Sequence, residues 1–198
     1  MNTTFAIENR IARITLARPE RFNCISSTLL SEMSEHLTAA EDHAEVRALL
    51  ILAEGPHFCT GADLDEVQQL RENATRLRAF LAKGHRFLDQ LTASSLPVVA
   101  GVQGLCLAGG LELSLATDVV IAAHDAQFGC QHANYRLIPG WDGSRRLPRT
   151  VGLRPSKSGV RPGGEGCSVS SRAFRIRAPG ALSGRGEPGS LSECSSAW

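Results

Sequence analysis

The chain of 198 residues has the length of a single domain, and its 42% content of hydrophobic residues is sufficient for a globular core. A formal net charge of only +1 argues against a nucleic-acid-binding protein. The longest apolar runs, such as residues 48–53, are too short to span a bilayer, so we expect no membrane partner. The absence of an apolar signal segment near the N-terminus and the wide spacing of the six cysteines predict free thiols and a cytoplasmic location.

Two elements are predicted in the first 45 residues. Apolar and polar residues alternate over Thr4–Pro19 on both sides of Asn9, a pattern that predicts a β-hairpin. Ser26 or Ser27 can cap the helix that follows, which is expected to run to about residue 42. Apolar residues at helical spacing define the buried face of this helix. They are Leu30, Met33, Leu37 and Ala40.

The middle of the chain alternates strands with helices. The unbroken apolar run at Ala48–Glu54 predicts a strand in a sheet covered on both faces. One long helix is predicted over about Leu64–Leu91, where leucine and valine recur at helical spacing. Pro97–Gly104 and Asp118–His124 predict further strands, separated by a short helix around Glu112. The recurring strand–strand–helix order indicates an α/β fold of stacked units.

The composition changes near Arg154. Between Ser156 and Trp198 there are ten Ser, eight Gly and three Pro, and no apolar periodicity persists. Such a segment buries too little apolar surface to offset the entropy lost on ordering. We therefore expect a folded core at residues 1–153 and an atypical, disordered tail rich in Ser, Gly, Pro and Arg at residues 154–198. A natural disordered tail and a loss of the reading frame near Arg154–Lys157 both fit this composition, and the abruptness of the change favours the second.

Two glycine-containing segments precede predicted helices. Phe58–Leu64 reads FCTGADL, and Gly104–Asp118 reads GLCLAGGLELSLATD. Gly109 and Gly110 have no side chain to block a ligand, so their backbone N–H groups can point into a cavity. Glu112 lies in the first turn of the following helix. The pattern therefore places an acid/base carboxylate beside an oxyanion hole.

These segments belong to a longer pattern that resembles the enoyl-CoA hydratase/isomerase (crotonase) superfamily. The resemblance rests on Arg18–Asn23 (RPERFN), His57–Val67 (HFCTGADLDEV), Pro97–Ala123 and Ala126–Leu153, in that order. It implies a crotonase-like spiral of ββα units with an acyl-CoA substrate, CoA being part of that substrate, and with no metal or redox cofactor. Members form homotrimers or hexamers through C-terminal helices. The resemblance stops near Arg154, so the usual C-terminal helical part is expected to be missing, and we do not expect this chain to assemble in that way.

The resemblance also assigns roles to individual residues. It implies that the N–H groups of Ala62 and Gly109 form an oxyanion hole for the thioester carbonyl. Glu112 matches one of the two glutamates that hold the reacting water in hydratases. The second glutamate falls at position 132, where this chain has His132. A histidine transfers protons near neutral pH but does not complete a two-carboxylate clamp around one water, so a spectator role for His132 also stays open.

The activity implied by these residues is hydration of 2-enoyl-CoA. Two alternatives stay open: double-bond isomerisation that uses His132, and a catalytically inactive fragment of a crotonase-like protein. Arg21, Asp63 and Leu64 are expected to line the CoA channel, although Arg21 is equally compatible with a solvated surface charge. Asp142 stands where the family usually has glycine, and we expect it either to occupy a type I turn or to narrow the site.

Overall fold

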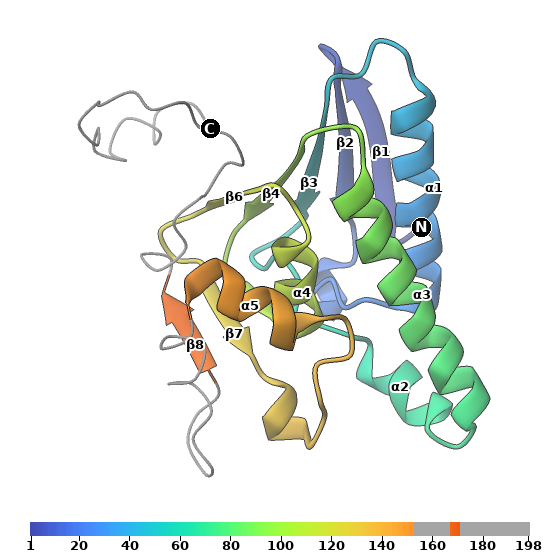
Figure 1. Ribbon diagram of the computed structural model, residues 1–198, viewed down its shortest axis with the longest axis vertical. Coiled ribbons are helices and arrows are strands. Elements are labelled where there is room, and N and C mark those ends of the chain that lie inside the picture. The colour runs from blue at the N-terminus through green and yellow to red at the C-terminus, as the bar shows by residue number, and fades with distance from the viewer. Residues whose placement is uncertain (153–166, 171–198) are drawn as a thin grey trace.

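The computed structural model describes residues 1–152 and 167–170, and its largest element is a five-stranded sheet in the order β1-β2-β3-β4-β6 (Figure 1). The pair β1 and β2 is antiparallel, and the remaining neighbours are parallel. The strands are β1 (Thr3–Glu8), β2 (Ile11–Leu16), β3 (Ala48–Ala53), β4 (Val98–Val102) and β6 (Val119–Ala122). All of the strands predicted for this sheet are therefore present.

The predicted hairpin and first helix are confirmed. Asn9 and Arg10 connect β1 to β2 with φ of 51° and 68°, and two left-handed residues give a turn the twist that a hairpin needs. Helix α1 (Ser27–Asp42) begins after Ser26, whose side chain accepts a hydrogen bond from the N–H of Leu29. The predicted apolar face of α1 is buried.

The single long helix predicted over Leu64–Leu91 is wrong, because the structure has two helices there. They are α2 (Leu64–Leu70) and α3 (Ala74–Ala93). The Asn73 side chain accepts hydrogen bonds from the next turn of backbone N–H groups, and this capping begins a new helix. Helix α3 packs against α1 and runs beside it along the sheet (Figure 1).

A second, smaller sheet has the order β5-β7-β8. Its strands are β5 (Leu105–Leu107), β7 (Gln127–Cys130) and β8 (Cys167–Ser170). Two successive turns of the chain each add one strand to each sheet: β4 is followed by β5 and helix α4 (Gly109–Leu115), and β6 is followed by β7. This is the predicted α/β fold of ββα units. The strand β8 falls within the predicted tail, and the rest of that tail lies outside the described residues.

The core lies between the sheets and the helices. Leu49 and Ile51 on β3 are fully buried, whereas the alternate residues Leu50 and Leu52 are only half-buried. No residue of β3 is exposed, as expected for a strand covered on both faces, but one face is covered more completely than the other. The remaining elements are the short helices η1 (Pro19–Arg21) and η2 (His132–Tyr135) and helix α5 (Gly143–Val151). In the part of the chain that the structure describes, no helix is long and apolar enough to cross a membrane.

Candidate active site

A cavity of about 720 Å³ lies where α3, α4 and the segment before α5 meet. All seven residues that the sequence singled out as catalytic or substrate-binding border it. They are Arg21, Ala62, Asp63, Leu64, Gly109, Glu112 and His132. The fold thus brings residues from four separate segments to one place.

The segments of Ala62 and Gly109 touch each other at the wall of the cavity. A Cβ atom built on Gly109 would lie 3.4 Å from the amide nitrogen of Ala62. Gly61 has φ of +111°, and a Cβ there would lie 2.9 Å from the Cβ of Ala108. Ala108 itself has φ of 47°, a conformation that alanine rarely adopts and that is typical of functional turns. Glycine is therefore needed at position 61 for this close approach.

The backbone N–H groups next to this contact are occupied. The N–H of Asp63 donates to the carbonyl of Ile25, and the N–H of Ala108 donates to the carbonyl of Gly129. By contrast, within the described ranges the amides of Ala62 and Gly109 donate to no acceptor. Two unpaired donors border the same cavity, and such donors are strong sites for an oxygen that carries negative charge.

The Glu112 carboxylate is buried, with 1% of the residue exposed. Its Oε1 accepts hydrogen bonds from the backbone N–H groups of Trp141 and Gly143, both at 2.9 Å. A Cβ on Gly143 would lie 2.9 Å from this Oε1, so only glycine allows the contact. One carboxylate oxygen is thus held by the loop before α5, and Oε2 is left to face His132.

His132 connects Glu112 to Cys130. The His132 Nε2 lies 3.5 Å from Glu112 Oε2, and its Nδ1 lies 3.4 Å from Cys130 Sγ. Burial lowers the pKa of His132, but its contacts with Cys130 and with the Glu112 carboxylate outweigh burial and raise the pKa to about 9. At neutral pH His132 is therefore an imidazolium, and its ring faces Glu112 Oε2.

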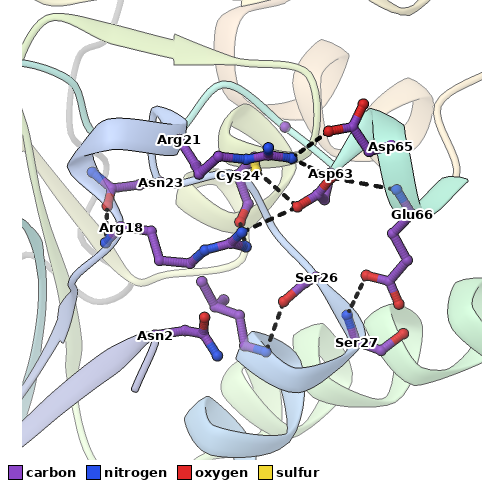
Figure 2. Close-up of polar contacts among 12 residues, drawn as sticks. Asn2, Arg18, Arg21, Asn23, Cys24, Ser26, Ser27, Asp63, Asp65 and Glu66 are labelled. Carbon is purple, nitrogen blue, oxygen red and sulfur yellow. Dashed lines mark hydrogen bonds and ion pairs between the residues drawn. The ribbon is translucent and has the colours of Figure 1, made fainter.

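Arg21, Asp63 and Asp65 line the cavity where Arg21 and Asp65 reach solvent, and this end is called the mouth of the cavity. Figure 2 shows the polar contacts of these side chains. The Arg21 guanidinium donates to Asp63 at 3.1 Å and to Asp65 at 2.6 Å, and Arg18 donates to Asp63 at 3.2 Å. Burial raises the pKa of Asp63, but hydrogen bonds from Cys24, the Glu66 backbone and Arg18, with the charge of Arg21, outweigh this and lower it. Arg21 thus lies at the cavity mouth, but its charge is already matched by two carboxylates.

Two features of the loop before α5 were not expected. Asp142 has φ of 73° and so lies in the left-handed region, which excludes it from the two central positions of a type I turn. It pairs with Arg145 and does not border the cavity, so it does not narrow the site. Trp141, by contrast, borders the cavity and holds Glu112, and sequence reasoning missed it. Gly140 and Gly143, on either side of Trp141 and Asp142, were the one signal in the sequence that the backbone passes close to another group here.

Comparisons with known proteins agree with this architecture. The family model described as "Enoyl-CoA hydratase/isomerase" matches residues 6–161. A probable enoyl-CoA hydratase of Bacillus subtilis is 37% identical over 150 residues, which are 75% of this chain and 57% of that protein. The mitochondrial methylglutaconyl-CoA hydratase of Mus musculus is 34% identical over 152 residues, covering 76% of this chain and 48% of that protein.

Solved structures give the same result. The crystal structure of an enoyl-CoA hydratase from Bacillus anthracis superposes with a TM-score of 0.79 at 30% identity, covering 87% of this chain and 66% of that one. The chain spans about half the length of the curated relatives it matches. Sequence, sheet topology and the cavity between α3 and α4 all lead to the same assignment: this chain belongs to the enoyl-CoA hydratase/isomerase family.

Proposed function

We propose that the protein hydrates the double bond of 2-enoyl-CoA thioesters. The observation that carries this proposal is the placement of the Glu112–His132 pair in one cavity with the unpaired amides of Ala62 and Gly109. Related proteins carry names such as crotonyl-CoA hydratase from Syntrophomonas wolfei and short-chain-enoyl-CoA hydratase from Clostridium acetobutylicum, which supports the same reaction class.

The reaction begins when the thioester oxygen accepts hydrogen bonds from the amides of Ala62 and Gly109. Glu112 Oε2 removes a proton from water while the water oxygen bonds to C3 of the substrate. The π electrons of the C2–C3 double bond move toward C1 and generate an enolate, whose oxygen carries the negative charge. Aimed N–H donors stabilise such a charge, and loss of one donor typically raises the barrier by about 3–4 kcal/mol.

The protonated His132 supplies the second proton. Its Nε2–H donates this proton to C2, the enolate returns to a thioester, and the product is the 3-hydroxyacyl-CoA. Glu112 then holds the proton taken from water, and His132 lacks one. Transfer from Oε2 to Nε2, which are 3.5 Å apart, restores the starting state. In this way a carboxylate and an imidazolium replace the two-glutamate pair.

Binding and turnover together test this proposal. The purified chain should bind butyryl-CoA more tightly than free CoA in calorimetry, because only the thioester carries the carbonyl that the amides would hold. It should also consume crotonyl-CoA with formation of 3-hydroxybutyryl-CoA. Equal affinity for the two ligands would contradict the oxyanion hole. Binding without turnover would instead support the alternative of a catalytically inactive protein.

A histidine variant separates hydration from isomerisation. His132→Glu restores two carboxylates, and we expect it to raise crotonyl-CoA hydration if His132 limits the rate. Isomerisation would be favoured by two results together. The unmodified protein would convert a 3-enoyl-CoA to the 2-enoyl-CoA without hydrating it, and the His132→Gln variant would lose this conversion.

A further inference from the structure

We infer that the Trp141 side chain closes the inner end of the cavity and restricts the substrate to short acyl chains. This inference rests on the proposed function, because it assigns the acyl-chain class of the same site. It depends on how Trp141 is held, on which residues line the cavity with it, and on how closely its indole approaches Gly109.

The indole of Trp141 fills the space between α3 and α4. Only 3% of the residue is exposed. A Cβ on Gly84 of α3 would lie 2.2 Å from indole Cε2 and Nε1, and a Cβ on Gly109 of α4 would lie 2.7 Å from indole Cζ3. The ring therefore reaches from one helix to the other and contacts a glycine at each end. The Phe80 ring packs against it with centroids 5.5 Å apart.

This position is fixed from both the backbone and the side chain. The backbone N–H of Trp141 donates to Glu112, so the residue cannot move without disturbing that carboxylate. The indole Nε1 is buried, has no hydrogen-bond partner among the described residues, and lies against Gly84. Because this N–H faces α3, the indole presents an apolar wall to the cavity rather than a polar group.

The indole of Trp141 lies directly beside the proposed oxyanion hole. A thioester whose oxygen is held at Gly109 would begin its acyl chain next to indole Cζ3. Apolar residues line the cavity together with Trp141, among them Leu77, Phe80 and Leu81 from α3 and Leu137. An apolar chain fits these neighbours, but growth inward is blocked by the indole. The alternative route leads outward past Leu64 and Ile138, which are 45% and 86% exposed and would give a long chain little burial.

The test compares the affinities of free CoA, butyryl-CoA, octanoyl-CoA and dodecanoyl-CoA for four proteins. These are the unmodified chain, Trp141→Ala, Trp141→Leu and a control, Phe87→Leu. Phe87 is as buried as Trp141 and lies on α3, but it does not border the cavity. Trp141→Leu keeps an apolar side chain in place if the alanine variant does not fold, and thermal unfolding identifies a variant that has lost its structure.

We expect the unmodified chain to bind butyryl-CoA at least tenfold more tightly than dodecanoyl-CoA, the scale on which apolar pockets discriminate. Both Trp141 variants should shift this ratio at least tenfold toward the longer chain, and Phe87→Leu should leave it unchanged. Equal binding of all chain lengths by the unmodified chain, or a ratio unaffected in the Trp141 variants, would overturn the inference. If butyryl-CoA bound no better than free CoA, the proposed function itself would fail.

Discussion

The two ends of the cavity are built in different ways. At the inner end, buried groups meet through backbone amides and close glycine contacts, as in the clamp of Glu112 by Trp141 and Gly143. At the mouth, half-exposed ion pairs such as Arg21–Asp65 meet in contact with solvent (Figure 2). Buried contacts without room to relax are costly to disturb, whereas exposed ion pairs contribute little. The comparison predicts large effects of substitution at the inner end and small ones at the mouth.

The largest effect is expected for Glu112→Gln. An amide does not accept the proton from water, so we expect crotonyl-CoA hydration to fall by about 10²–10⁴-fold. Steady-state rates at saturating substrate provide the measurement. Glu20→Gln is the matched control, because Glu20 borders the same cavity at its mouth. A comparable loss in both variants would show that the two ends do not differ.

Gly143→Ala tests the clamp without touching a titratable group. The new Cβ would lie 2.9 Å from Glu112 Oε1 and 3.0 Å from its Cγ, so the carboxylate must shift. We expect a loss of about 1–3 kcal/mol in the free energy of unfolding, together with reduced hydration. In Gly140→Ala the new Cβ meets only the flexible end of Leu81, and the loss should be smaller. Denaturant unfolding of both variants measures the difference, and equal losses would contradict the clamp.

The charge of His132 should set a pH limit. Because its pKa is raised to about 9, hydration should decline as the pH rises through 9 and the imidazolium is lost. The raised pKa also stabilises the folded state, fully below the unfolded pKa of about 6.5 and progressively less as the pH approaches 9. The stability advantage over His132→Gln should therefore shrink over this interval. A rate that stays constant through pH 9 would exclude His132 as the acid.

The smallest effect is expected at the mouth. Arg21→Ala should lower the midpoint of thermal unfolding only slightly, and the difference should vanish in high salt, because the Arg21 side chain is 43% exposed. Arg18 is the matched control, since its side chain is 16% exposed and also donates to the carbonyl of Cys24. Arg18→Ala should cost about 1–2 kcal/mol. A larger loss for Arg21→Ala would show that exposure does not govern this cluster.

Local sequence patterns determined most of the elements. The hairpin, α1, β4 and α4 follow from alternation, helical spacing and capping over short stretches, where each residue's environment depends on its neighbours, whereas the short strand β5 was not predicted. The break between α2 and α3 was also local, but the leucine periodicity masked the capping signal of Asn73. The motif resemblance likewise predicted which seven residues would border one cavity, although their catalytic roles stay predictions.

Only the tertiary structure decided how the site is held together. The contacts of Glu112 with Trp141 and Gly143 join residues 29 and 31 positions apart, and Gly84 meets the indole of Trp141 from a third segment. The sequence contains no short-range pattern for these contacts, because they depend on where two helices and a loop converge after packing. The raised pKa of His132 has the same origin, because the contacts with Cys130 and with Glu112 that outweigh the lowering effect of burial form in the folded chain.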